Sequence, residues 1–157
     1  MMNKDKLILG LDTYIQHQYF DMDSFGEPLE EVSTALSTLS SLDPELCLAY
    51  SKRILTDKNL GDPYLDGACL RHIFDLEPEY AINYVSENVS TMHPAVLSEA
   101  MYGLCLYNKI SFRKVITSNL IHKIYIRYDE LAKNDFAKEV MALDFNYFHK
   151  DFSRVGD

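Results

Sequence analysis

Apolar residues recur every three or four positions along most of this chain, which is the period of helices that bury one face. Segments with this period begin near each of the five prolines, Pro28, Pro44, Pro63, Pro78 and Pro94. Proline suits the first turn of a helix, because its missing N–H would have no partner there and its φ is already helical. No segment alternates between apolar and polar residues as a half-buried strand would. The pattern therefore predicts an all-α chain.

The remaining helices are predicted from periodicity alone. One is expected over residues 4–19, before the first proline. The segment after residue 112 is apolar on every side unless it breaks near Ser118, so we expect a helix to begin there. A last helix is expected to begin near Asp135, with an inward stripe of Phe136, Val140, Leu143 and Tyr147. The total is eight or nine helices.

The spacing of the prolines suggests stacked helix pairs. Gaps of 34 and 35 residues separate Pro44 from Pro78 and Pro28 from Pro63, and Leu42-Asp43-Pro44-Glu45 recurs as Leu76-Glu77-Pro78-Glu79. These junctions resemble those of tetratricopeptide (TPR) repeats over about residues 28–108. The Trp, Leu-Gly and Tyr pattern of that family is missing, and the irregular gaps are more similar to HEAT or armadillo helix pairs. We therefore expect one domain over residues 1–157, an antiparallel helix stack.

The charge is divided unevenly along the chain. The net charge is −9, but residues 1–105 hold 17 acidic and 6 basic residues, whereas residues 106–157 hold 7 acidic and 9 basic ones. We therefore distinguish acidic helix pairs over 1–107 from more basic helices over 108–152. Dense carboxylates attract a basic partner, although many proteins are acidic for solubility alone.

The cysteines and histidines do not form a familiar reactive pattern. Cys47, Cys69 and Cys105 are far apart, and their odd number fits buried thiols in a reducing compartment. His72 lies three residues from Cys69, so a nucleophile–base pair is one interpretation. A core histidine is the favoured one, because no third orienting group stands at helical spacing. We expect no catalytic residue, and the protein is interpreted as a non-enzyme.

Metal, phosphate and nucleic-acid sites are also not expected. Asp21-Met22-Asp23-Ser24-Phe25-Gly26 imitates the start of a calcium loop, but Phe25 and Val32 occupy two ligand positions. The glycines form no phosphate-binding loop. A basic segment with two interleaved aromatic residues would suit nucleic acid, but a chain of net charge −9 binds phosphates poorly. That segment contains Lys109, Phe112, Arg113, Lys114, Lys123, Tyr125 and Arg127.

The only early apolar run is too short for a membrane span or a signal-peptide core. Leu7–Leu11 is interrupted at once by Asp12. We therefore expect a cytoplasmic protein without a membrane partner.

Stacked helices present extended faces that mostly bind other proteins, and tyrosine is enriched in such interfaces. A small acidic helix stack of this character resembles the immunity proteins of bacterial toxin–immunity systems, including contact-dependent inhibition. The resemblance implies binding to a cognate toxin, often a cationic nuclease, through an acidic surface. From charge and aromatic content we expect the partner-binding residues to be Asp21, Asp23, Glu27, Glu30, Glu31, Asp62, Tyr64, Asp66, Glu79 and Tyr80.

Two other functions remain open at this stage. The repeated junctions also resemble those of TPR-like secretion chaperones, which hold an extended client peptide in a groove. HEAT-like DNA glycosylases share the expected architecture, but they need a positive concave surface, and residues 1–105 are strongly negative.

Overall fold

The computed structural model describes residues 3–18, 28–108 and 115–154. Within these ranges the chain forms eight α-helices and one 3₁₀ turn, and no strand. The chain divides into two compact units, residues 1–76 and residues 77–157, which are described separately. The all-α prediction is confirmed.

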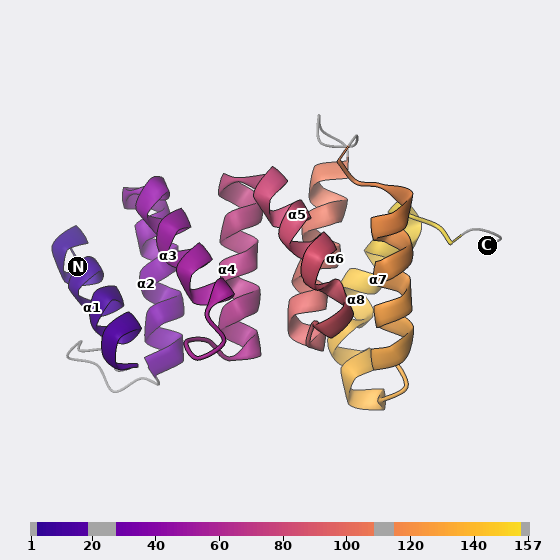
Figure 1. The fold of residues 1–157 in the computed structure, drawn as a ribbon, viewed down its shortest axis with the longest axis horizontal. Helices are drawn as coiled ribbons and strands as arrows, with labels where there is room; N and C mark the ends of the chain where they lie inside the picture. The colour runs from indigo at the N-terminus through magenta and orange to yellow at the C-terminus, as the bar shows by residue number, and fades with distance from the viewer. Residues whose placement is uncertain (1–2, 19–27, 109–114, 155–157) are drawn as a thin grey trace. The chain divides into compact units, whose positions relative to one another are not determined.

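The first unit is built around α2. Its elements are α1 (Lys4–His17), α2 (Pro28–Leu42), α3 (Pro44–Thr56) and α4 (Pro63–Leu76). α2 contacts each of the other three helices, and the chain reverses direction from α2 to α3 and again to α4 (Figure 1). The α2 residues Val32, Ala35, Leu36 and Leu39 are fully buried. This single apolar stripe therefore forms the centre of the unit's core.

Two tyrosines connect the helices of the first unit through their hydroxyl groups. Tyr50 on α3 donates to Oδ1 of Asp12 on α1 at 2.5 Å. Tyr14 on α1 donates to the carbonyl oxygen of Leu60, in the segment before α4. Both rings are largely buried, so each hydroxyl needs a partner inside the unit.

The second unit is built around α6 and α8. Its elements are α5 (Pro78–Asn88), η1 (Val89–Thr91), α6 (Pro94–Asn108), α7 (Ser118–Leu131) and α8 (Asp135–Asp151). α8 packs along α6, and α7 lies against η1. The Ser98 hydroxyl on α6 donates to the Asp144 carboxylate on α8. The rings of Tyr128 on α7 and Phe145 on α8 stack with 3.6 Å between their centroids.

The predicted helix starts agree closely with the structure. Helices α2 to α6 each begin at one of the five prolines, α7 begins at Ser118 and α8 at Asp135. Asp43 caps α3, where its Oδ1 accepts the Leu46 N–H at 3.1 Å. The prolines therefore begin the helices as expected.

The predicted inward stripe of α8 was wrong. Phe136, Leu143 and Tyr147 are 70, 66 and 55 % exposed. The buried face instead carries Ala137, Met141 and Phe148. α8 is apolar on two faces, and the second face meets α6 and the rings of α7, which fixes the orientation of the helix.

Candidate functional site

One end of the first unit gathers three of its segments around a shallow hollow. The last turn of α1, the start of α2 and the residues before α4 meet there. The hollow has a volume of about 360 Å³ and is lined by Tyr14, Gln18, Pro28, Leu29, Leu60, Gly61 and Asp62. The arrangement places the first turns of α2 and α4 at the same end of the unit. We call this region the acidic end.

Several of the predicted partner-binding residues lie at the acidic end. Glu30 is exposed and Glu31 is half-buried in the first turn of α2. Tyr64, in the first turn of α4, is 62 % exposed. Asp62 precedes α4 and its Oδ1 accepts the Leu65 N–H at 2.8 Å. One oxygen of Asp62 is therefore occupied as a helix cap.

Asp66 differs from these residues because its carboxylate is partly buried. Its Oδ1 has no hydrogen-bond partner among the described residues. Burial, followed by the negative charge of Asp62, raises the pKa of Asp66 to about 6. An ionised carboxylate without a donor is costly inside a protein. Asp66 is therefore a poorer contact for a partner than the sequence suggested.

The same negative charge acts on Tyr14. Burial raises the pKa of the Tyr14 hydroxyl, and the charges of Asp62 and Asp66 add to this effect. The carboxylates of the acidic end therefore act electrostatically on the buried Tyr14 hydroxyl. The first turn of α4 adds an exposed aromatic ring, Tyr64, to the same end.

The other predicted residues are not brought to the acidic end. Glu79 is exposed and Tyr80 is half-buried in α5, which belongs to the second unit. Asp21, Asp23 and Glu27 lie outside the described residues, as does the imitation of a calcium loop.

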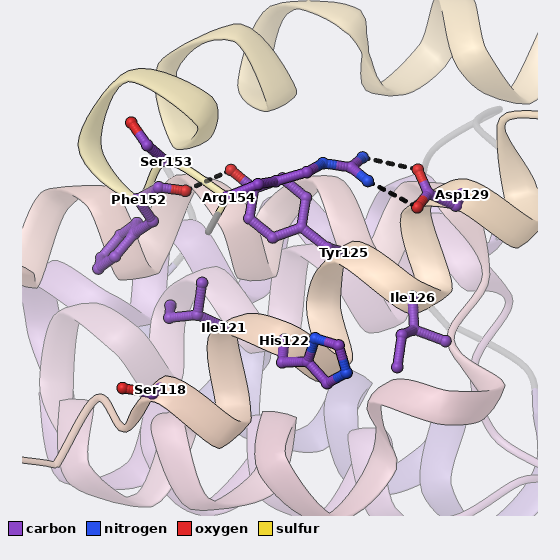
Figure 2. A pocket seen from close by; sticks show the side chains of 9 residues that line it. All are labelled: Ser118, Ile121, His122, Tyr125, Ile126, Asp129, Phe152, Ser153 and Arg154. Atoms are coloured by element: carbon purple, nitrogen blue, oxygen red, sulfur yellow. Dashed lines mark hydrogen bonds and ion pairs between the residues drawn. The ribbon is translucent and has the colours of Figure 1, made fainter. Parts of the chain in front are cut away.

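A second hollow lies in the second unit, between α7 and the residues that follow α8. It has a volume of about 480 Å³ and is lined by Ser118, Ile121, His122, Tyr125, Ile126, Asp129, Phe152, Ser153 and Arg154. Figure 2 shows the tail residues Phe152 to Arg154 along one side and the α7 side chains along the other. Sequence reasoning missed this hollow, because its two walls are more than twenty residues apart and carry no motif.

The tail is held to α7 by three contacts. The two Arg154 guanidinium nitrogens donate to the two Asp129 oxygens at 2.6 and 2.8 Å (Figure 2). The guanidinium carbon lies 4.4 Å from the Tyr125 ring centroid. The Tyr125 hydroxyl donates to the Phe152 carbonyl oxygen. Because Asp129 neutralises Arg154, this hollow does not present a free cation to an anionic ligand.

The Cys69–His72 pair does not have the chemistry of a nucleophile and its base. Cys69 is fully buried, and burial raises the pKa of its thiol far above the ordinary value. Burial also lowers the pKa of His72. A reactive cysteine needs a lowered pKa and access to solvent. Cys69 therefore acts as a core residue.

The described residues contain no group of three or more His, Cys, Asp or Glu side chains placed to hold a metal ion. None of the described helices combines the length and apolar character that a membrane crossing requires. Comparison of the chain with protein-family models finds no match, and comparison with curated proteins finds no relative.

Proposed function

We propose that this protein is a non-catalytic binding protein that holds one folded basic protein against the acidic end of its first unit. The functional class we assign is that of immunity proteins, which neutralise a cognate bacterial toxin of the cationic nuclease type. The proposal is supported by one juxtaposition. The first turns of α2 and α4 lie at the same end of the unit and carry Glu30, Glu31, Asp62 and the exposed ring of Tyr64.

Electrostatics favours a basic partner for this surface. Residues 1–76 carry 13 acidic and 6 basic side chains, a net charge of −7. A field of one sign accelerates the capture of an oppositely charged protein, and the effect weakens as salt screens it. In an immunity protein the carboxylates would occupy the toxin surface that otherwise receives nucleic-acid phosphates.

Tyr64 gives the acidic end an anchor of a different kind. Its ring is 62 % exposed although it belongs to the first turn of a well-packed helix. Tyrosine adds large contact area at low entropic cost, and interface hot spots are enriched in it. An exposed ring in the same helix turn as Asp66 suits a partner surface that combines arginines with an apolar pocket.

The proposal includes a cytoplasmic location and no catalytic step of the protein's own. Cys47, Cys69 and Cys105 form no disulfide, which fits a reducing compartment. Helix pairs of the HEAT or armadillo type would serve as a rigid scaffold for the binding surface.

The first experiment identifies the partner. The protein is co-expressed with the product of the gene immediately upstream, and cell survival and complex formation are measured. We expect protection from a toxin and nanomolar or tighter binding that weakens as salt rises. Capture of no folded protein, together with no protection, would remove the immunity proposal. Binding to an unfolded segment instead would indicate a chaperone.

The second experiment locates the binding surface. Tyr64→Ala should weaken the complex at least about tenfold, because truncation of a hot-spot residue costs about 2 kcal/mol or more. Glu30→Gln should mainly slow association and reduce its salt dependence. Glu45→Gln is the matched control, since Glu45 is exposed in the first turn of α3, at the opposite end of α2. An equal effect of both glutamines would contradict a localised site.

A further inference from the structure

The outer face of α8 carries an apolar stripe that the second unit does not cover. Phe136, Leu143 and Tyr147 are 70, 66 and 55 % exposed, and Val140 between them is half-buried. At 3.6 residues per turn the four positions fall within about 60° of one another around the helix. Single exposed apolar residues are common, but an aligned row of large ones marks an interaction surface.

The helix cannot turn this stripe inward. The other apolar face of α8 is fixed against α6 by buried Met141 and Phe148 and by the hydrogen bond between Ser98 and Asp144. Phe145 is stacked on Tyr128 of α7. The stripe therefore stays exposed in the folded unit. Only a surface from outside the unit can cover it.

The order of the stripe is the same from both ends. The four residues are separated by four, three and four positions, so the pattern is symmetric about a point between Val140 and Leu143. A second α8 running antiparallel across a twofold axis at that point places Phe136 opposite Tyr147 and Val140 opposite Leu143. Each contact occurs twice, as a self-complementary interface requires.

The charges beside the stripe select the antiparallel direction. Asp135 and Glu139 lie near the start of α8 and Lys150 near its end, all three exposed and on the same flank of the stripe at 100° per residue. An antiparallel pair brings Lys150 of one copy near Asp135 of the other. A parallel pair would place the charged flanks of the two copies on opposite sides of the contact, where Asp135 and Lys150 cannot pair. The antiparallel arrangement also sets the two helix dipoles in opposite directions.

We propose that two copies of this chain associate through the outer faces of their α8 helices, antiparallel and across a twofold axis. The contact consists of one helix face from each copy, which is below the size of a standard interface. The dimer is therefore expected to be weak and to depend on concentration. This surface is distinct from the acidic end, so the dimer and the proposed partner complex can form or fail independently.

The association is tested by sedimentation velocity from low micromolar to several hundred micromolar protein. We expect the wild type to shift from monomer to dimer, and Leu143→Lys to remain monomeric. Leu9→Lys is the matched control, since Leu9 on α1 is also exposed, at 62 %. It should dimerise as the wild type does. Thermal unfolding checks that both variants fold, because each replaces an exposed side chain.

The antiparallel direction is tested by exchanging charges. Asp135→Lys and Lys150→Glu should each weaken the dimer about fivefold, from two symmetry-related exposed pairs. The double variant should return to wild-type affinity, since each copy then offers the reversed pair. A wild type that stays monomeric at every concentration overturns the proposal, and so does a folded Leu143→Lys dimer. Failure of the double variant to recover overturns the antiparallel direction.

Discussion

Gly61 and Asp66 lie so close together that there is no room for a side chain at residue 61. A Cβ built on Gly61 would overlap Oδ1 of Asp66 and would lie 3.5 Å from Cγ2 of Ile54. The backbone of Gly61 is not left-handed, so glycine is required here by the close approach and not by its φ. The same approach covers the Asp66 oxygen that lacks a hydrogen-bond partner.

Gly61→Ala should destabilise the protein by about 1–2 kcal/mol, because the new methyl group forces the Asp66 carboxylate to move inside a packed site. Urea unfolding at neutral pH measures the loss as a lower midpoint at unchanged slope. The control is the same substitution in an Asp66→Ala background, where the clash is absent. There Gly61→Ala should be neutral or stabilise slightly, since alanine restricts the unfolded chain. An equal loss in both backgrounds would refute the explanation.

Asp66→Asn should stabilise the protein at pH 7 and have little effect near pH 4. The pKa of Asp66 is raised to about 6 in the folded state, against 3.8 for an ordinary aspartate side chain. The folded state therefore binds more protons between these values, and stability falls as the pH rises from about 4 to about 6. At pH 7 the Asp66 carboxylate is ionised, and its charge lowers the free energy of unfolding. After a discount for solvent screening of this half-exposed group, we expect a gain of about 1–2 kcal/mol.

The measurement for Asp66 is the difference in unfolding free energy between variant and wild type, taken across that pH range. The difference removes the titration of the other carboxylates. Glu45→Gln, on an exposed side chain, is the control for the loss of one surface charge. A difference that is flat from pH 4 to pH 7 would show that the Asp66 carboxylate is not penalised.

The sequence predicted the helix starts well because their signals are local. A proline after an acidic cap acts through its own φ and through a hydrogen bond three residues away, as at Asp43 and Leu46. Local signals of this kind do not depend on which helix packs against which.

The sequence did not predict which side chains are buried where burial depends on packing between distant segments. α8 offers Phe136, Leu143 and Tyr147 on one face and Met141 and Phe148 on another, and only the contacts with α6 and α7 decide which is buried. Asp66 seemed to be a first-turn carboxylate like any other, but the approach of Gly61 buries one of its oxygens. The hollow beside Tyr125 was missed for the same reason.

Cys105 should react with a thiol reagent faster than the other two cysteines. Cys47 and Cys69 are fully buried, whereas Cys105 is only half-buried. Burial raises the pKa of both buried thiols, which reduces their thiolate fraction. Reaction with Ellman's reagent should show one fast thiol in native protein and three after denaturation. Cys105→Ser should remove the fast phase and Cys47→Ser should keep it; a second fast thiol would contradict the buried positions.

Arg154→Ala should release the tail from α7 without unfolding the unit. The side chain is lost from a bidentate pair with Asp129 and from the face of the Tyr125 ring. Both charged groups are partly exposed, so the global loss should be below about 1 kcal/mol. Hydrogen exchange read by mass spectrometry should show faster exchange in the C-terminal peptide and unchanged protection in the peptides of α6.

The tail contact should also depend on geometry and pH. Arg154→Lys keeps the charge but loses the planar two-donor fork. Compared with Arg154→Ala, it should therefore restore only part of the tail's protection from hydrogen exchange.

Arg154 lowers the pKa of Asp129 through its hydrogen bond and charge. A lowered folded pKa means that the stabilisation is present at neutral pH and is lost only as the pH falls below the ordinary range of a carboxyl group. Lys150→Ala, on the last turn of α8, is the control that should leave tail exchange unchanged. If Arg154→Ala leaves it unchanged as well, the ion pair does not hold the tail, and the Tyr125 hydroxyl contact with Phe152 is sufficient.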